Sequence, residues 1–247
     1  MYSSPPMQSV MALTRSTVGQ KAVIAVTGVI LFGFVIGHLL GNLLVFAGPE
    51  TFNEYAWTLK HNPPLLWGTR ITLLVSVVVH IALTMQLARR NQGARANGYK
   101  KARRDQITTY AARSMVLTGP LLAAYIVFHL LHFTAPGLDF GRYDFSAHDP
   151  YSNLVHSFRW WPIAATYMFA SLMLGLHIYH GGWSAAQSIG LQHPKYDKLR
   201  TALAAGLAIF LTVGNVAIPV SVLARVVGTD AQLTEAVQSA EQLQEEH

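Results

Sequence analysis

Long apolar runs without a charged residue constrain this chain more than any other feature. The stretch 25–46 holds no charged side chain, and about 20 mostly apolar residues are enough for a helix to cross a bilayer. Only 12% of all residues are charged, against about a quarter in soluble domains. Five segments are long and apolar enough, namely residues 22–47, 65–87, 111–133, 162–184 and 199–223. The sequence therefore predicts an all-α integral membrane bundle of five transmembrane helices.

Basic residues predict the orientation of these helices. Lys and Arg concentrate in the N-terminal segment and in the second and fourth connections, above all in the stretch 88–105, whereas the acidic residues gather on the other side. Cytoplasmic loops carry an excess of Lys and Arg, so we expect the N-terminus in the cytoplasm. Residues 1–225 form the predicted five-helix domain. Residues 226–247 form an acidic C-terminal tail, which is either a short helix or disordered.

Four of the six histidines inside these apolar segments lie at depths that match in pairs. His38 and His129 lie about 12 Å short of the outer surface, and His80 and His177 about 10 Å short of the inner surface. An internal repeat supports the pairing, because "VTGVILFGFVIGH" ends at His38 and "LTGPLLAAYIVFH" ends at His129. Helices 1–2 and 3–4 are therefore interpreted as two copies of one hairpin, related by an axis along the membrane normal.

Facing neutral imidazoles in a bundle core favour axial ligation of haem iron. We expect two b-type haems, an outer one held by His38 and His129 and an inner one held by His80 and His177. The chain contains no cysteine, which excludes iron–sulfur ligation and covalent c-type haem attachment on this chain. A single membrane histidine can also serve only as a hydrogen-bonding group between helices.

Four polar residues near the ligands leave two alternatives each. His132 and His180 lie three residues beyond a ligand on a similar helix face, and we expect them to contact haem propionates rather than iron. Thr27 and Thr118 lie eleven residues before His38 and His129, which is close to three full turns. Each threonine either contacts the cofactor or hydrogen-bonds to carbonyl groups of its own helix.

The chain resembles the cytochrome b membrane subunit of succinate dehydrogenase and fumarate reductase, of the single-chain, five-helix, two-haem type. The stretches that carry the resemblance are "VIGHLLGN", "GPETFNEYA", "VVHIALTMQLARR", "TGPLLAAYIVFH" and "GLHIYHGGWSAAQSIGL". They cover the four histidine helices and leave the fifth helix and the tail largely unmatched. In the last and most specific stretch, the resemblance places the ligand position on His177 rather than His180 and implies that Trp183 is a further cofactor-binding residue.

The resemblance implies a haem-bearing anchor of succinate:quinone oxidoreductase (respiratory complex II) in a prokaryotic inner membrane. A flavoprotein subunit and an iron–sulfur subunit would dock on the basic cytoplasmic face, and electrons would pass through both haems to menaquinone or ubiquinone. This chain would carry electron transfer and quinone reduction only, with no catalytic residue for succinate. Its other contacts would be membrane lipid and, in a higher oligomer, further copies of the complex, with no nucleic acid.

The resemblance also points to a quinone site on the outer side. Glu50 would handle quinone protons, with Trp67 and Arg70 lining the same pocket, although Glu50 can equally be an ordinary loop acid. Two other functions remain open at this stage. One is a di-haem anchor of a fumarate reductase or another dehydrogenase, and the other is a haem-free transporter or scaffold that uses its histidines for proton transfer.

Overall fold

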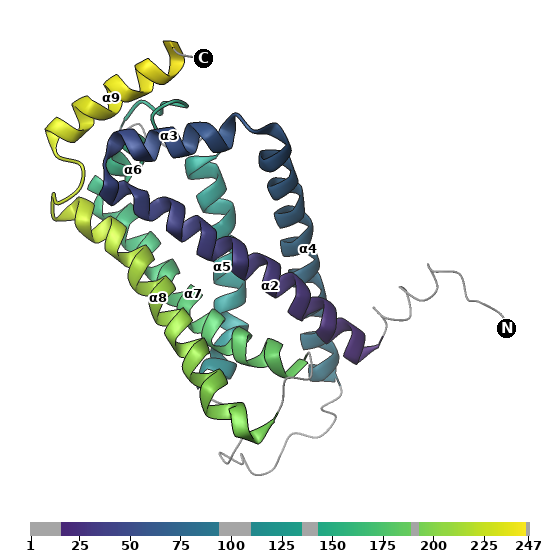
Figure 1. The fold of residues 1–247 in the computed structure, drawn as a ribbon. Coiled ribbons are helices and arrows are strands. Elements are labelled where there is room, and N and C mark those ends of the chain that lie inside the picture. The colour runs from purple at the N-terminus through teal and green to yellow at the C-terminus, as the bar shows by residue number, and fades with distance from the viewer. Residues whose placement is uncertain (1–15, 94–109, 135–142, 189–192, 246–247) are drawn as a thin grey trace.

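The computed structural model describes residues 16–93, 110–134, 143–188 and 193–245. Within these ranges every regular element is a helix (Figure 1), which confirms the all-α class. The elements are α2 (Thr17–Asn42), η1 (Leu43–Ala47), α3 (Pro49–Lys60), α4 (Pro63–Gly93), α5 (Tyr110–Phe133), α6 (Pro150–Arg159), α7 (Trp161–Ser188), η2 (Pro194–Tyr196), α8 (Asp197–Leu223) and α9 (Asp230–Glu245). Most of the basic stretch 88–105, the predicted docking surface for soluble subunits, lies outside the described residues.

Four helical segments are long and apolar enough to cross a membrane, so the chain has the character of a multi-pass membrane protein. They are Thr17–Ala47, Pro63–Arg90, Trp161–Gln187 and Pro194–Leu223, and they coincide with the first, second, fourth and fifth predicted segments. In α5 the apolar part, Leu117–Phe133, is shorter, so the third span remains a prediction. Large apolar side chains cover the helix surfaces, as a lipid environment requires; Leu74, Ile209 and Val213 are 64%, 63% and 61% exposed.

Local sequence signals explain where the helices begin and why two of them continue through proline. Ser16 caps α2 by accepting a hydrogen bond from the backbone N–H of Gly19 at 3.0 Å. Gly48 has a φ of 113°, which favours glycine, and it turns the chain into α3. As expected from the sequence, Pro120 and Pro219 lie inside α5 and α8 without ending them.

The helices form a bundle with a helical cap at one end. In the bundle α2 packs against α4 and α7, while α5 and α8 both pack against α7. The cap consists of α3, α6 and α9, which lie together where α2 and α8 end (Figure 1). The opposite end, where α4 ends and α8 begins, carries exposed basic side chains such as Arg89, Lys195 and Lys198. We call the two ends the cap end and the basic end.

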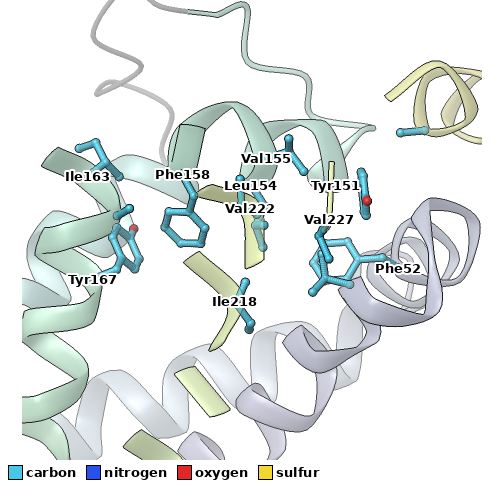
Figure 2. Packing of buried hydrophobic residues seen from close by; sticks show 13 residues of the cluster. Phe52, Tyr151, Leu154, Val155, Phe158, Ile163, Tyr167, Ile218, Val222 and Val227 are labelled. Carbon is cyan, nitrogen blue, oxygen red and sulfur yellow. The ribbon is translucent and has the colours of Figure 1, made fainter. Parts of the chain in front are cut away.

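The best-buried apolar core lies between the cap helices and the cap end of the bundle. Tyr151 and Val155 of α6 are fully buried there, together with Val222 of α8. Figure 2 shows Phe158 and Tyr167 pointing toward each other in this cluster, and their ring centroids lie 5.0 Å apart. The core therefore fixes α6 and α7 close to the cap-end side of the histidine helices.

Asn53 joins the three cap helices through polar contacts. Its Nδ2 lies 3.2 Å from Asp149 Oδ1, 3.2 Å from the carbonyl oxygen of Ala236 and 3.1 Å from Ser239 Oγ. Its Oδ1 accepts a hydrogen bond from the backbone N–H of Tyr151 at 3.1 Å. Of the two alternatives for the C-terminal tail, the structure therefore supports the helix.

Candidate functional site

Two of the predicted histidines meet near the cap end. The ring centroids of His38 on α2 and His129 on α5 lie 5.8 Å apart, with the ring planes at 77°. Phe34 stacks on His38 at 5.2 Å, and Tyr125 stacks on His129 at 5.9 Å, each from its own helix. Since α2 and α5 each pack on α7 and not closely on each other, these two rings bridge them. We call His38 and His129 the cap-side pair.

The other two predicted histidines meet nearer the basic end. The ring centroids of His80 on α4 and His177 on α7 lie 6.5 Å apart, with the ring planes at 60°. These helices, too, do not pack closely on each other. We call His80 and His177 the basic-side pair. The structure thus brings together both pairs that the depth argument predicted.

The spacing within each pair suits two axial ligands of one metal ion. An imidazole nitrogen binds a metal at about 2.0 Å and lies about 1.1 Å from its ring centre, so two ligands on opposite sides of one ion have centroids about 6.2 Å apart. The observed distances of 5.8 Å and 6.5 Å lie on either side of that value. Each pair offers two nitrogens, the number that a haem iron with two axial imidazoles takes from the protein.

The second ring nitrogen has a partner in three of the four histidines. His80 Nδ1 lies 3.2 Å from both Thr27 Oγ1 and the carbonyl oxygen of Ile24. His177 Nδ1 lies 3.4 Å from Thr118 Oγ1. A ligating histidine commonly donates its other ring N–H to such an acceptor. In that tautomer Nε2 is unprotonated and available for metal.

The two threonines play equivalent parts in the two hairpins. Thr27 and Thr118 are 7% and 1% exposed, and each contacts the histidine of the following helix in its own hairpin. Thr27 Oγ1 also lies 2.8 Å from the carbonyl oxygen of Val23. The hydrogen bond to its own helix is thus confirmed for Thr27, its hydroxyl also approaches the His80 imidazole, and contact with a cofactor stays a prediction.

His129 shares its partner with His132. The hydroxyl oxygen of Tyr167 lies 3.3 Å from His129 Nδ1 and 2.8 Å from His132 Nδ1. His132 is 1% exposed and packs against Phe128 and Phe133, whereas His129 faces His38. Sequence reasoning missed Tyr167, although a tyrosine in an otherwise apolar predicted span was a signal that it had a polar partner.

His180 and Trp183 lie near the basic end of α7. Their ring centroids are 6.4 Å apart, and the Arg200 guanidinium lies 5.8 Å from the centre of the Trp183 ring. Two contacts at this end remain predictions. One is between His180 and a haem propionate, and the other is between Trp183 and the cofactor.

Glycines near the histidines serve two different purposes. A Cβ at Gly41 would lie 2.6 Å from the ring of Tyr55, and one at Gly214 would lie 2.8 Å from Leu39, so these glycines permit close packing. At Gly33 and Gly37, by contrast, no atom of the described residues lies within 4 Å of an added Cβ. Both positions are exposed, so the surface of α2 is open there.

The three residues predicted for a quinone site do not gather in one place. Trp67 and Arg70 lie together at the start of α4, where the Arg70 guanidinium is 5.3 Å from the centre of the Trp67 ring. Glu50 is exposed in the first turn of α3. The ten residues from Glu50 to Lys60 span about 15 Å of helix, so α3 separates Glu50 from the other two.

Comparisons with protein-family models, curated proteins and solved structures find no match for this chain. What the site can do therefore follows from its own residues.

Proposed function

We propose that this chain binds two b-type haems and serves as the membrane anchor of a succinate:quinone oxidoreductase. One observation supports the haem assignment above all others. Two pairs of imidazole rings lie between the helices in two layers. The two rings of each pair are close together, with centroid distances of 5.8 Å in one pair and 6.5 Å in the other. In three of these four rings Nδ1 has a protein partner, so that Nε2 can bind iron.

When bound, each haem supplies a centre that accepts and releases one electron. His38 and His129 would hold the outer haem, and His80 and His177 would hold the inner one. The partners of Nδ1 fix the rotation of the His80, His129 and His177 rings and would make these rings stronger electron donors to the iron. The eleven residues between Thr27, beside His80, and His38 span about 16 Å along α2. The two sites therefore lie in different halves of the span.

The complex-II assignment rests on the resemblance of the four histidine helices. In it, a flavoprotein and an iron–sulfur subunit dock at the basic end, on the cytoplasmic side. The described residues at that end include Arg89, Lys195 and Lys198, and their charge agrees with the predicted orientation. The quinone, menaquinone or ubiquinone, is the electron acceptor, and its head group would bind either at Glu50 or at the Trp67–Arg70 pair.

The haem assignment is tested by the visible spectrum of the purified chain. We expect reduced-minus-oxidised bands of low-spin b-type haem and two haems per chain. His177→Ala should leave one haem, bound mainly by the cap-side pair, while His148→Ala, which changes an exposed histidine outside the spans, should leave two. A spectrum without haem would contradict the proposal and favour the haem-free transporter or scaffold.

The complex-II assignment needs a separate measurement. Affinity purification of the chain from its own membranes should recover a flavoprotein and an iron–sulfur protein, and succinate should then reduce both haems. If fumarate oxidised the reduced haems faster than succinate reduced the oxidised ones, the result would favour a fumarate reductase. Recovery of a different dehydrogenase would refute the succinate assignment while leaving the haem assignment intact.

A further inference from the structure

A groove on α4 lies away from the histidine pairs. Its volume is about 620 Å³. The apolar part is lined by Val78, Ile81, Ala82 and Met85, and the polar end by Gln86, Arg89 and Arg90. These residues recur three or four positions apart and therefore share one face of the helix. His80 lies on the opposite face, so the groove is separate from the basic-side pair.

The length and polarity of this groove match one lipid molecule in one leaflet. Val78 and Arg90 are twelve residues apart, which is about 18 Å along the helix, and half of a typical hydrocarbon core is about 15 Å. Arg90 ends the apolar span Pro63–Arg90. The groove therefore runs from the middle of the membrane to its surface at the basic end. A soluble protein cannot reach the apolar part, whereas an amphiphile can fill both parts.

The polar end of the groove carries two arginine side chains. Arg89 makes no hydrogen bond or ion pair with any residue that the structure describes. The Arg90 guanidinium is held by α2, because its Nη1 donates to Gln20 Oε1 at 3.2 Å. Gln20 is fully buried, and its Nε2 donates to Gln86 Oε1 at 2.8 Å. Two neighbouring guanidinium groups, one of them held in place, suit phosphate oxygens.

We propose that this groove binds one anionic phospholipid. Its phosphodiester lies against Arg89 and Arg90, and one acyl chain runs along the stripe from Met85 to Val78. The proposal does not depend on haem, because the groove lies on the face of α4 opposite His80. A quinone would fit the apolar part of the groove, but its neutral head has no need of two arginines.

Native mass spectrometry of the full-length protein, with any subunits that copurify, tests this proposal. After delipidation we add phosphatidylglycerol or phosphatidylcholine. We expect one tightly held phosphatidylglycerol and at least about tenfold weaker retention of phosphatidylcholine, since each basic residue near the surface contributes about 1 kcal/mol to the binding of an anionic lipid.

Two variants separate charge from shape. Arg89→Gln/Arg90→Gln should weaken phosphatidylglycerol retention by about tenfold or more. Ala82→Trp should also weaken it, because the indole fills the apolar part while the charge is unchanged; Ala82 is exposed, so the substitution leaves the helix packing intact. Circular dichroism confirms that each variant is folded.

A matched control removes the same charge at the same end, outside the groove. Lys195→Gln/Lys198→Gln should retain phosphatidylglycerol like the unchanged protein. Three results would each overturn the proposal. They are an equal loss in this control, equal retention of the two lipids, and displacement of phosphatidylglycerol by a water-soluble short-chain quinone.

Discussion

At the scale of single residues, Tyr167 is the contact that most distinguishes the two imidazole pairs. If Nδ1 of His129 donates a hydrogen bond, the Tyr167 oxygen accepts it, and the Tyr167 hydroxyl can then donate to His132 Nδ1. The distances of 3.3 Å and 2.8 Å fit this chain of hydrogen bonds. The basic-side pair uses threonine hydroxyls and a backbone carbonyl instead. The two sites therefore differ in the groups that accept a hydrogen bond from the ligand histidines.

Tyr167→Phe is expected to raise the midpoint potential of the outer haem and to leave the inner one unchanged. Without the Tyr167 oxygen to accept its hydrogen bond, the His129 imidazole becomes a weaker electron donor to the iron and stabilises the ferric state less. A potentiometric titration followed by visible spectroscopy measures both potentials. Tyr125→Phe is the control, because Tyr125 contacts His129 through ring stacking. Equal shifts in the two variants would show that Tyr167 acts only as a packing residue.

The sequence reveals ligand candidates more readily than it reveals their partners. A histidine in an apolar span stands out by itself, and matched depths alone pair His38 with His129 and His80 with His177. The Ile24 carbonyl carries no such signal, since every residue has a backbone carbonyl. Likewise, only a folded structure places the Tyr167 hydroxyl between two histidines.

At the scale of elements, the cap is the part that the sequence defined least. The sequence predicts only connections where α3 and α6 form, and it does not decide whether the tail is a helix or disordered. Helices of 10 to 16 residues are marginal in isolation, so tertiary contacts decide whether they form. Here the deciding contacts come from Asn53 and from the buried core around Tyr151. Long apolar spans need no such help, because their composition already specifies them.

Asn53→Ala is expected to loosen α9 from the cap. The change removes a side chain that is 1% exposed and contacts Asp149, Ala236 and Ser239. It also leaves the buried backbone N–H of Tyr151 without the Asn53 oxygen that accepts its hydrogen bond, and a buried polar group without a partner costs about 1–3 kcal/mol. Thermal unfolding and the rate of limited proteolysis in the link before α9 measure the effect. Glu54→Ala, at the exposed neighbouring position, is the control. Unchanged proteolysis in Asn53→Ala would contradict this role.

The cap should also lose stability as the pH falls. Burial, followed by the nearby Arg159 guanidinium, lowers the pKa of His156 on α6 below its usual value of 6.5, although Asp149 opposes the shift. The unfolded chain then takes up a proton at a higher pH than the folded one. The contribution of His156 is therefore complete above about pH 6.5 and is lost as the pH falls from there toward its folded pKa. Hydrogen exchange of α6 between pH 8 and pH 5 measures this, and His156→Phe should make the profile flatter.

At the scale of the whole molecule, contacts in the cap bear on the span that is still a prediction. Lys60 Nζ, at the end of α3, donates to the carbonyl oxygen of Ala147 at 3.0 Å, and the rings of Trp57 and His148 lie 6.1 Å apart. The segments before α4 and after α5 therefore lie at the same end of the molecule. If α4 crosses the membrane, the chain has to cross again between its end and Ala147. Helix α5 is the described element that can make this second crossing.

Cysteine labelling tests this topology directly, because the chain contains no cysteine of its own. Single cysteines replace four exposed residues. Thr58 precedes α4 and His148 follows α5, whereas Lys198 lies at the start of α8 and Glu241 lies beyond its end. On intact cells a membrane-impermeant maleimide should label Thr58→Cys, His148→Cys and Glu241→Cys, whereas Lys198→Cys should react only after the membrane is opened. If α5 did not span, Thr58→Cys and His148→Cys would react from opposite sides. If the orientation predicted from the Lys and Arg residues were reversed, only Lys198→Cys would be labelled from outside. The proposed docking of soluble subunits at the basic end would then be wrong as well.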